Sequence, residues 1–217
     1  MVKINPDRNL KEDVISIGVK KFIVGPLSTN CYLVYDFQNQ AILIDPGFED
    51  KKIDNFIKNN HLQVKYILLT HAHFDHVGAV LFYKNLTKAK IAMHRDEIDI
   101  LKKFSGMRAN MFGYRVKLFV SDLFLEDGRE LKVGKIEIKV IHTPGHSSGG
   151  LSFYLPKENV IITGDTLFMG AVGRTDIPGS DENELWNSII KKLLVLPDET
   201  RVLPGHGEET TIGQENN

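Results

Sequence analysis

Short runs of apolar and β-branched residues recur along the chain, and glycine, proline or aspartate separates one run from the next. Runs of about four to eight such residues between turn-forming residues are typical of β-strands. The pattern therefore predicts strands at Val14 to Val24, Cys31 to Tyr35, Ala41 to Ile44, Lys65 to Leu69, Lys90 to Met93, Lys135 to Ile141, Leu151 to Leu155, Val160 to Thr163 and Thr200 to Leu203.

Between several of these runs, apolar residues recur at helical spacing. Leu185, Ile189 and Leu193, for example, fall on one face of a helix. This periodicity predicts helices at Asp50 to Asn60, His76 to Leu86, Asp96 to Phe104 and Asp181 to Leu196.

The order of these elements indicates how the chain is organised. Strands in runs, with helices interspersed, favour two sheets with helices outside. The chain has no internal repeat, low-complexity tract or linker-like stretch, so a single domain is the simplest prediction. The least regular segment, Phe104 to Asp127, mixes Met, Phe and Tyr with Gly, and we expect either a mobile flap or a loop with its own small cluster.

Composition and charge limit the classes of partner. The 217 residues are 42% hydrophobic and 25% charged, which is ordinary for a globular protein, and the net charge of −1 gives no reason to expect nucleic acid or an anionic membrane as a partner. No apolar run approaches the roughly 20 residues of a membrane span, and the N-terminus lacks the apolar core of a secretory signal. The single cysteine, Cys31, excludes an internal disulfide framework and fits a reducing cytosol. We therefore expect a cytoplasmic protein that acts on a small molecule, with its oligomeric state left open.

A dense cluster of titratable residues follows the apolar run at 66–69. Within six positions the chain carries His71, His73, Asp75 and His76. His71 and His73 stand two residues apart, so in an extended loop their side chains point the same way. Imidazole and carboxylate suit zinc or iron, whereas calcium and magnesium prefer oxygen ligands. A polar loop whose histidines cap a helix is the alternative, but three of the eight histidines fall here, which favours a metal site.

Three further predicted strands end in a glycine-bearing turn with a candidate ligand. The turns are HTPGHSSGG at 142–150, GDT at 164–166 and PGHG at 204–207. Ligands delivered by strand-end loops can meet on one edge of a sheet sandwich, where a rigid scaffold positions them. The sequence therefore favours one shared metal site.

Other polar residues have simpler interpretations. We expect His142 to hydrogen-bond within its loop, His94 to cap a helix or make a surface contact, and His61 to lie on the surface at a helix end. Asp45 either orients a metal-binding loop or caps the turn that follows it. Cys31 is expected in the core.

Taken in order, the motifs THAHFDH, HTPGHSSGG, TGDTLF and PGHG resemble those of the metallo-β-lactamase superfamily. The residues within these motifs are most similar to those of its glyoxalase II (hydroxyacylglutathione hydrolase) branch, and in particular to its short, single-domain bacterial members. The resemblance implies an α+β fold: a four-layer αβ/βα sandwich of two mixed β-sheets with helices on the outer faces. It implies one domain over residues 1–217, without the C-terminal helical domain that supplies much of the glutathione site in glyoxalase II proper.

The resemblance also implies a centre of two divalent metal ions, zinc first, with iron or manganese as alternatives. The first metal would be held by His71, His73 and His146, and the second by Asp75, His76 and His206, with Asp165 bridging both. Asp75 is in addition the candidate catalytic residue. A water or hydroxide would supply the remaining bridge.

Such a centre predicts a hydrolase. Two metals can lower the pKa of a shared water and create a hydroxide that attacks a carbonyl, so no serine or cysteine nucleophile is required, and no G-x-S-x-G is present. The leading expectation is a thioester such as S-lactoylglutathione. Arg174 is the candidate substrate-binding residue, and a salt bridge to Asp176 or Asp181 is the alternative for its side chain.

Other reactions on this fold remain alternatives. The G-R-T-D segment also resembles persulfide dioxygenases, which would use one iron held by His71, His146 and Asp165. A lactonase would use the same hydroxide, and a degenerate metal-binding module is disfavoured because no ligand is missing. Asp165 stands where β-lactam-cleaving members often carry cysteine, which disfavours that activity.

Overall fold

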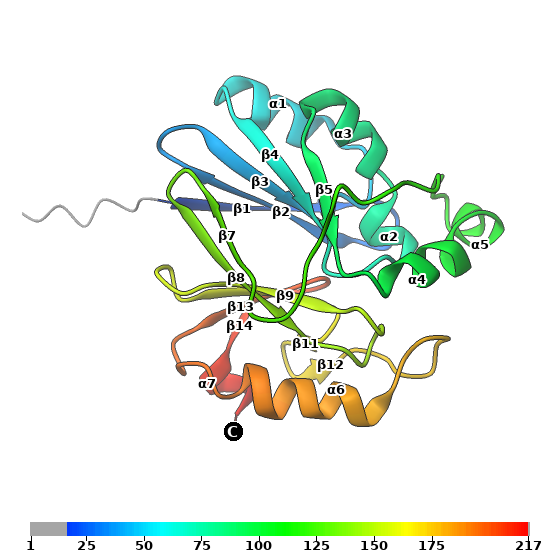
Figure 1. The fold of residues 1–217 in the computed structure, drawn as a ribbon, viewed down its shortest axis with the longest axis vertical. Coiled ribbons are helices and arrows are strands. Elements are labelled where there is room, and N and C mark those ends of the chain that lie inside the picture. The colour runs from blue at the N-terminus through cyan, green and yellow to red at the C-terminus, as the bar shows by residue number, and fades with distance from the viewer. Residues whose placement is uncertain (1–16, 217) are drawn as a thin grey trace, which may run out of the picture.

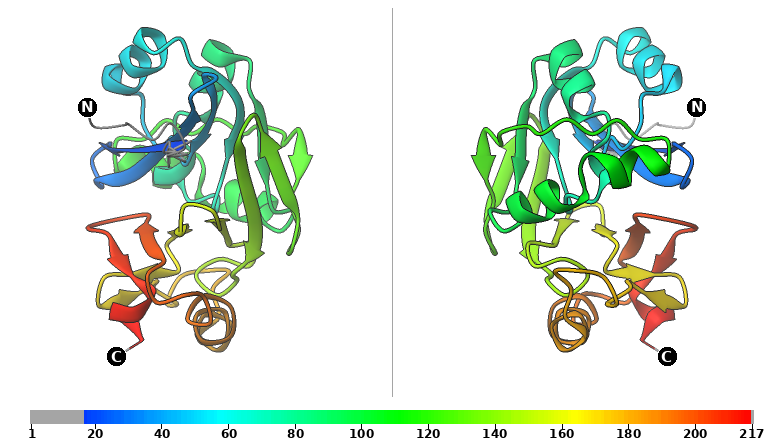
Figure 2. Two further views of the ribbon diagram at one scale, coloured as in Figure 1. Left: turned by 90° about the vertical axis from the view of Figure 1, so that its left-hand side faces the viewer. Right: turned by 90° about the vertical axis from the view of Figure 1, so that its right-hand side faces the viewer.

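The computed structural model describes residues 17–216, which form two six-stranded sheets with helices on their outer faces (Figure 1). Viewed from either side, the helices α1 (Lys51–Asn59) and α3 (Val80–Thr87) cover one sheet, and α6 (Glu182–Ser188) covers the other (Figure 2). This is the predicted four-layer αβ/βα sandwich, and the predicted fold class is confirmed. The first three residues of the first predicted strand, 14–16, lie outside the described residues.

The first sheet has the order β1-β2-β3-β4-β5-β6. Its first three strands pair antiparallel, and the pairs from β3 to β6 are parallel, so the sheet is mixed. Parallel pairing brings the C-terminal ends of the parallel strands to one edge, where the candidate ligands begin. The strands are β1 (Ile17–Val24), β2 (Thr29–Asp36), β3 (Gln40–Ile44), β4 (Gln63–Leu68), β5 (Lys90–Met93) and β6 (Leu123–Phe124).

The second sheet has the order β14-β13-β10-β9-β8-β7, and it is mixed because β10 and β13 are parallel while the other pairs are antiparallel. A separate two-stranded ribbon lies beside it. The strands are β7 (Glu130–Val133), β8 (Ile136–His142), β9 (Leu151–Leu155), β10 (Val160–Gly164), β13 (Arg201–Pro204) and β14 (Thr210–Thr211), with β11 (Leu167–Phe168) and β12 (Ala171–Val172) in the ribbon.

Apolar side chains fill three layers between these elements. Tyr32, Ile42 and Leu68 of the first sheet meet Phe153 and Ile162 of the second in the central layer. Separate clusters lie under α1 and α3 and under α6. Burial on both faces explains why β3 and β10 are almost continuously apolar. Cys31 lies in the cluster under α1 and α3, as expected.

The helix predicted from His76 to Leu86 is wrong as a single element. The structure has α2 (Phe74–Val77) and α3, interrupted at Gly78. A Cβ at Gly78 would lie 2.3 Å from the carbonyl oxygen of Gly47, and Ala79 N–H donates to Pro46 O. The loop after β3 therefore packs into the break, and this tertiary contact overrides the helical periodicity.

The other predicted helices are found with small differences. α4 (Glu97–Phe104) and α1 match their predictions, whereas α6 continues as a π-helix, Ile189–Leu193, and stops short of Leu196. A short helix, α7 (Ile212–Glu215), lies near the C-terminus. None of the helices within residues 17–216 has the length and apolarity needed to cross a bilayer.

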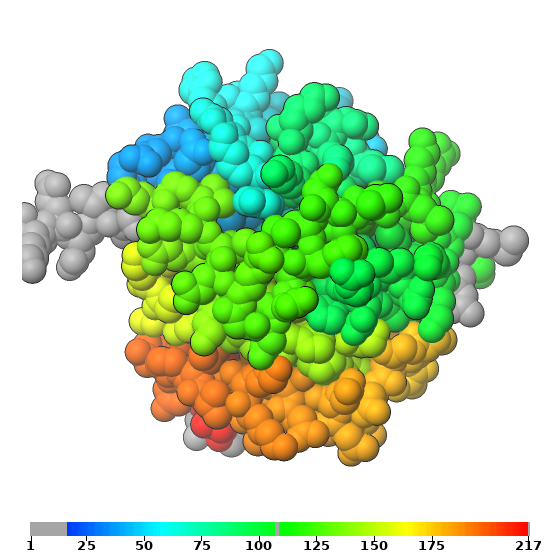
Figure 3. Space-filling view, viewed as in Figure 1, coloured from blue at the N-terminus to red at the C-terminus, as the bar shows by residue number. Residues whose placement is uncertain are grey.

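The irregular segment from Phe104 to Asp127 contains α5 (Met107–Met111) and the edge strand β6. Phe112 stacks on Phe74, with ring centroids 5.4 Å apart, and Tyr114 packs edge-on against Phe48. Of the two structures expected for this segment, the contacts show the loop with its own small aromatic cluster. The green residues of this part of the chain lie on the surface of the face shown in Figure 3, between the cyan helices and the orange α6. The other expectation, a mobile flap, is not tested by these contacts.

Candidate metal centre

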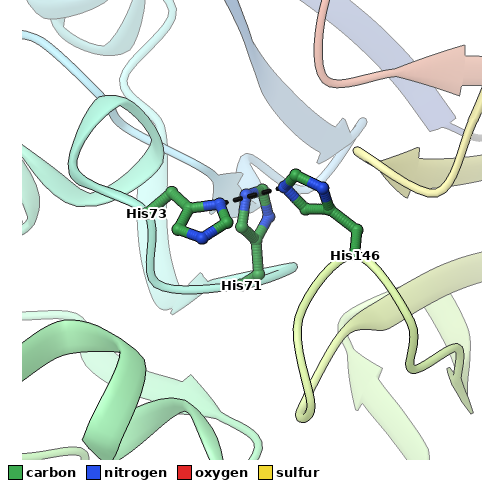
Figure 4. Close-up of side chains that lie close together, drawn as sticks. All are labelled: His71, His73 and His146. Carbon is green, nitrogen blue, oxygen red and sulfur yellow. Dashed lines mark hydrogen bonds between the residues drawn. The ribbon is translucent and has the colours of Figure 1, made fainter. Parts of the chain in front are cut away.

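The candidate ligands lie in loops that leave the ends of strands in both sheets. The loop after β4 carries His71, His73 and the α2 residues, and the loop between β8 and β9 carries His146. Figure 4 shows the rings of His71, His73 and His146 facing one another from these two loops. Asp165 follows β10, and His206 follows β13. The strand ends thus deliver all seven predicted ligands to one region between the sheets.

The first group of ligands consists of three buried imidazoles. His71, His73 and His146 each offer a ring nitrogen, and these atoms all lie within 4.8 Å of one another. His146 Nε2 lies 2.9 Å from His73 Nδ1, and the other ring nitrogen of His146 lies 2.9 Å from the carbonyl oxygen of Arg174. Because that carbonyl can only accept, it fixes His146 Nδ1 as the protonated nitrogen and leaves Nε2 to ligate.

The second group combines two histidines with a carboxylate. Asp75, His76 and His206 each offer one ligand atom, and these three atoms also lie within 4.8 Å of one another. Asp75 Oδ2 lies 3.1 Å from His206 Nε2 and 3.5 Å from His76 Nε2, and it accepts a hydrogen bond of 3.0 Å from the hydroxyl of Thr29. The side chain of His206 is 30% exposed, whereas that of His76 is fully buried. The second group is therefore the side of the centre that faces solvent.

Asp165 lies between the two groups. Its Oδ2 is 4.0 Å from His71 Nε2 and 3.6 Å from His146 Nε2, both in the first group. The same oxygen is 3.7 Å from His206 Nε2, and Oδ1 is 3.4 Å from His76 Nε2. One carboxylate thus contacts ligand nitrogens of both groups, as expected of a residue that bridges two cations.

The polar atoms at the centre fit a cation better than they fit one another. His71 Nε2, His76 Nε2 and Asp165 Oδ1 are buried and have no hydrogen-bond partner among the described residues. A buried polar atom without a partner costs about 1–3 kcal/mol. Nitrogen and carboxylate donors together suit zinc, iron or manganese, so the residues present fit a pair of such ions.

Burial keeps the first group neutral. Desolvation lowers the pKa of His73 to about 3, and it also lowers the pKa values of His71 and His146. A neutral imidazole has the free lone pair that a metal requires. The first group is therefore ready to bind a cation over the whole neutral range of pH.

The second group has the opposite balance. Burial by itself would lower the pKa of His76, but the nearby carboxylates of Asp165 and Asp75 outweigh it and raise that pKa. Likewise, burial opposes ionisation of Asp165 and Asp75, yet the histidines around them hold both carboxyl pKa values below the usual range. Burial also opposes the charge on His206, but its hydrogen bond with Asp75 raises the pKa of the ring. The second group is thus a set of opposite charges.

Asp45 supports both groups from beneath. Its Oδ1 accepts from Thr70 N–H at 2.8 Å, and its Oδ2 accepts from the Thr70 hydroxyl at 2.6 Å. The same Oδ2 lies 3.0 Å from His76 Nδ1, and the Thr70 hydroxyl lies 3.0 Å from His71 Nδ1. Of the two interpretations offered by the sequence, these contacts favour a residue that orients the metal-binding loop.

The remaining predicted residues lie outside the two groups. His142 Nε2 lies 3.1 Å from Ser148 O, within its own loop as expected, and His94 stacks on His142. His61 lies exposed beyond the end of α1. The Arg174 guanidinium forms two hydrogen bonds with Asp176 and is 63% exposed. For this side chain the structure shows the salt-bridge alternative, and its role in substrate binding stays a prediction.

Sequence reasoning missed three residues that hold the ligands in place: Thr29, Thr70 and Glu97. Thr29 reaches Asp75 across 46 positions of the chain, and Glu97 reaches the backbone of Ala72 across 25. Thr70 directly precedes His71, but nothing in the local sequence marks it as a partner of Asp45. No spacing rule predicts such contacts, because they arise only when the strands assemble.

Comparison with known proteins agrees with this geometry. The family model described as Metallo-beta-lactamase superfamily matches residues 24–206. The probable metallo-hydrolase YqgX of Bacillus subtilis is 38% identical over 89% of this chain and 92% of its own length. The hydroxyacylglutathione hydrolase GloC of Haemophilus influenzae is 38% identical over 86% of this chain and 89% of its own length.

Solved structures show the same relationship. The B3 metallo-beta-lactamase BLEG-1 has a TM-score of 0.85 and 38% identity, covering 91% of this chain and 96% of its own. TTHA1623, solved in a di-iron-bound form, has a TM-score of 0.82 and 39% identity, covering 91% and 97%. ETHE1 from Myxococcus xanthus has a TM-score of 0.74 and 26% identity, covering 92% and 82%. Because the family model and these relatives span nearly all of the described fold, the chain belongs to the metallo-beta-lactamase superfamily and is a metallo-hydrolase of that superfamily.

Proposed function

We propose that the protein is a binuclear metal-dependent hydrolase that cleaves a thioester of the S-lactoylglutathione type. The observation that carries the proposal is the position of Asp165, within 4.0 Å of ligand nitrogens from two complete groups. A mononuclear site would use one group, and it would give no reason for Asp75, His76 and His206 to converge beside it. The name of the Haemophilus relative supports the thioester.

The chain's own side chains have distinct tasks in this mechanism. His71, His73 and His146 would hold one ion and Asp75, His76 and His206 the other, with Asp165 between them. When bound, two divalent ions would lower the pKa of a shared water towards neutral pH. They would also provide positive charge close to the carbonyl oxygen of the substrate.

Asp75 and Thr29 are buried beside His206, the partly exposed residue of the second group. The Thr29 hydroxyl donates to Asp75 Oδ2 and holds this carboxylate beside the partly exposed His206. We propose that the carboxylate of Asp75, the candidate catalytic residue, also accepts a hydrogen bond from the attacking water and so orients it. His206 Nδ1 lies 3.2 Å from Leu27 O, so the loop before β2 fixes this ring in place.

Zinc is the proposed native metal, and iron or manganese suits the same donors. The di-iron form of TTHA1623 shows that a relative with 39% identity takes iron. We further propose that the protein acts in the cytoplasm on a small molecule, without nucleic-acid or membrane partners, in line with its net charge of −1.

Persulfide dioxygenation is the second candidate, and its support is the G-R-T-D segment together with the similarity to ETHE1. It would need one iron per chain on His71, His146 and Asp165. Lactone hydrolysis is a further alternative, because the same activated water attacks either carbonyl. The similarity to BLEG-1 adds a β-lactam to the substrates that deserve a test, even though Asp165 stands where β-lactam-cleaving members often carry cysteine.

The test combines metal content with a substrate panel. Metal-stripped protein would be reloaded with Zn²⁺, Mn²⁺ or, without oxygen, Fe²⁺, and each form assayed with S-lactoylglutathione, a homoserine lactone, a β-lactam and glutathione persulfide. We expect two ions per chain and turnover of the thioester. Oxygen uptake with the persulfide at one iron per chain, without thioester turnover, would overturn the proposal in favour of the dioxygenase.

A matched pair of variants separates the metal centre from general effects of losing a histidine. His206→Asn should lose the second ion and the thioester turnover. His61→Asn should retain both, because His61 is exposed and its φ of 52° is one that asparagine adopts readily.

A further inference from the structure

A buried carboxylate that belongs to neither ligand group lies against the first one. Glu97, in the first turn of α4, is 0% exposed. A glutamate is almost never fully buried unless its carboxylate is paired. No cation lies within salt-bridge distance of it among the described residues, so uncharged hydrogen-bond donors, among them the side chain of Ser147, must satisfy its oxygens.

Both oxygens of Glu97 accept hydrogen bonds from the backbone of ligand loops. Oε2 accepts from Ala72 N–H at 2.6 Å, and Oε1 accepts from Gly149 N–H at 3.0 Å. Ala72 stands between His71 and His73, and Gly149 follows His146 by three residues. One carboxylate therefore joins the two loops that carry all three ligands of the first group.

The contact with the second loop requires a glycine. A Cβ at Gly149 would lie 2.9 Å from Glu97 Cγ and 3.0 Å from both Glu97 N and Oε1. These distances are shorter than Cβ atoms normally make, so a larger residue would require the loop or Glu97 to shift by a few tenths of an ångström. The glycine of H-S-S-G thus allows the close approach of the His146 loop to Glu97 of α4.

We propose that Glu97 is a positioning residue that sets the metal affinity of the first ligand group alone. This inference rests on the proposed binuclear centre. The hydrogen bonds of Glu97 fix the distance between the His71–His73 loop and the His146 loop. Asp75, His76 and His206 are held instead by Asp45, Thr29 and the Leu27 carbonyl, and none of these hydrogen bonds involves Glu97.

The test uses Glu97→Gln, which keeps the size of the side chain. A glutamine has one acceptor oxygen, and its amide group would face an N–H donor, so one of the two loops must lose its bond. The variant is placed in two backgrounds: His206→Ala, which leaves the first group intact, and His146→Ala, which leaves the second. Zn²⁺ affinity is measured by competition with a chromophoric chelator at pH 8, above the Glu97 pKa of about 7 to which burial raises it.

In the His206→Ala background we expect Glu97→Gln to weaken Zn²⁺ binding by about 10- to 100-fold, the range known for residues that orient ligands. In the His146→Ala background we expect no change beyond about twofold. Asp99→Asn is the matched control, because it removes an exposed carboxylate from the same helix and should leave both affinities unchanged. Gly149→Ala keeps every charge and should reproduce the selective loss, so the test stands even if Glu97→Gln fails to fold.

Two results would overturn the inference. An equal loss in both backgrounds would make Glu97 a purely structural residue, and unchanged binding in both would remove any role at the centre. A failure of the proposed function is distinguishable from these, because the unmodified chain would then bind fewer than two ions before any substitution at Glu97 is made.

Discussion

The two halves of the candidate metal centre, its first and second ligand groups, differ in burial and in charge. The first group has three buried imidazoles whose pKa values are lowered by burial. The second mixes a carboxylate with two histidines whose pKa values are raised by nearby carboxylates, and one of these histidines is partly exposed. Burial dominates on one side and charge pairing on the other, although the two sides share Asp165.

This difference predicts different roles for the two halves. Neutral, buried nitrogens bind a cation without first losing a proton, so the first group is suited to retain its ion. A charged and partly exposed group binds in competition with protons and lies where a substrate can approach. The first half is therefore the anchor of the centre, and the second half is its adjustable, substrate-facing part.

The largest expected effect comes from the residue that the halves share. Asp165→Asn should weaken metal binding at both groups and lower thioester turnover by more than about 100-fold, because residues that merely orient ligands already contribute about 10- to 100-fold. Metal content and kcat are the measurements. Asp176→Asn, which changes an exposed carboxylate, serves as the control. Loss of one ion with the other retained would show that Asp165 belongs to one half only.

A smaller effect, mainly at the second group, is expected at Asp45, which contacts His76 directly and His71 only through the Thr70 hydroxyl. Asp45→Asn places an amide beside the Thr70 hydroxyl and His76 Nδ1, so His76 loses its orienting acceptor. We expect Zn²⁺ affinity at the second group to fall by about 10- to 100-fold. Asp50→Asn is the control, since asparagine caps α1 as well as aspartate does. Chelator competition is the readout, and an effect confined to the first group would contradict the assignment.

The pKa values predict that acid separates the two halves. His76 and His206 have pKa values raised above 6.5, so protons compete for them as the pH falls towards that range, and the affinity of the second group drops about tenfold per pH unit for each proton displaced. The histidines of the first group, with pKa values lowered below 6.5, keep their lone pairs to lower pH. Metal release followed from pH 8 to about pH 5 should show two steps. Release of the first group's ion at the higher pH would reverse the comparison.

The smallest effect is expected at Arg174. Its guanidinium is occupied by Asp176 and is mostly exposed, while its carbonyl oxygen contacts His146. Arg174→Ala keeps that carbonyl, so kcat should not change, and KM for S-lactoylglutathione should rise by less than about fivefold, the most that exposed ion pairs usually contribute. A larger rise in KM would restore Arg174 as a substrate-binding residue.

The region of the candidate ligands could be predicted from sequence because several of them follow apolar strands within a few residues, and strand ends of a sandwich share an edge, whereas their division into two groups came from the family resemblance. His71, His146 and Asp165 are all in this position. The contacts that support the ligands could not be predicted from sequence. Glu97, for example, looks like an ordinary acidic residue in the first turn of a helix, and only the folded chain shows that it is buried between two loops.

The errors in the predicted helices and strands have a related cause, because they too arise where distant segments meet. Gly78 interrupts a helix because Gly47 packs against it, and the strands β6, β11, β12 and β14 contain two residues each, too few to form a pattern. Local periodicity predicts most of the elements that fill the core, such as β5 and β9, whose predicted bounds match the structure, although it missed β7, which contributes Leu131 and Val133 to the core. It fails where a contact with a distant segment decides the conformation.

The proposed mechanism requires two cations that act together. The most direct test is a titration of the metal-stripped protein with Zn²⁺, in which hydrolysis of S-lactoylglutathione is followed at each addition. We expect little turnover while the buried first group fills and a steep rise as the second equivalent binds. Full turnover at one equivalent, with no gain from the second, would contradict the proposed mechanism.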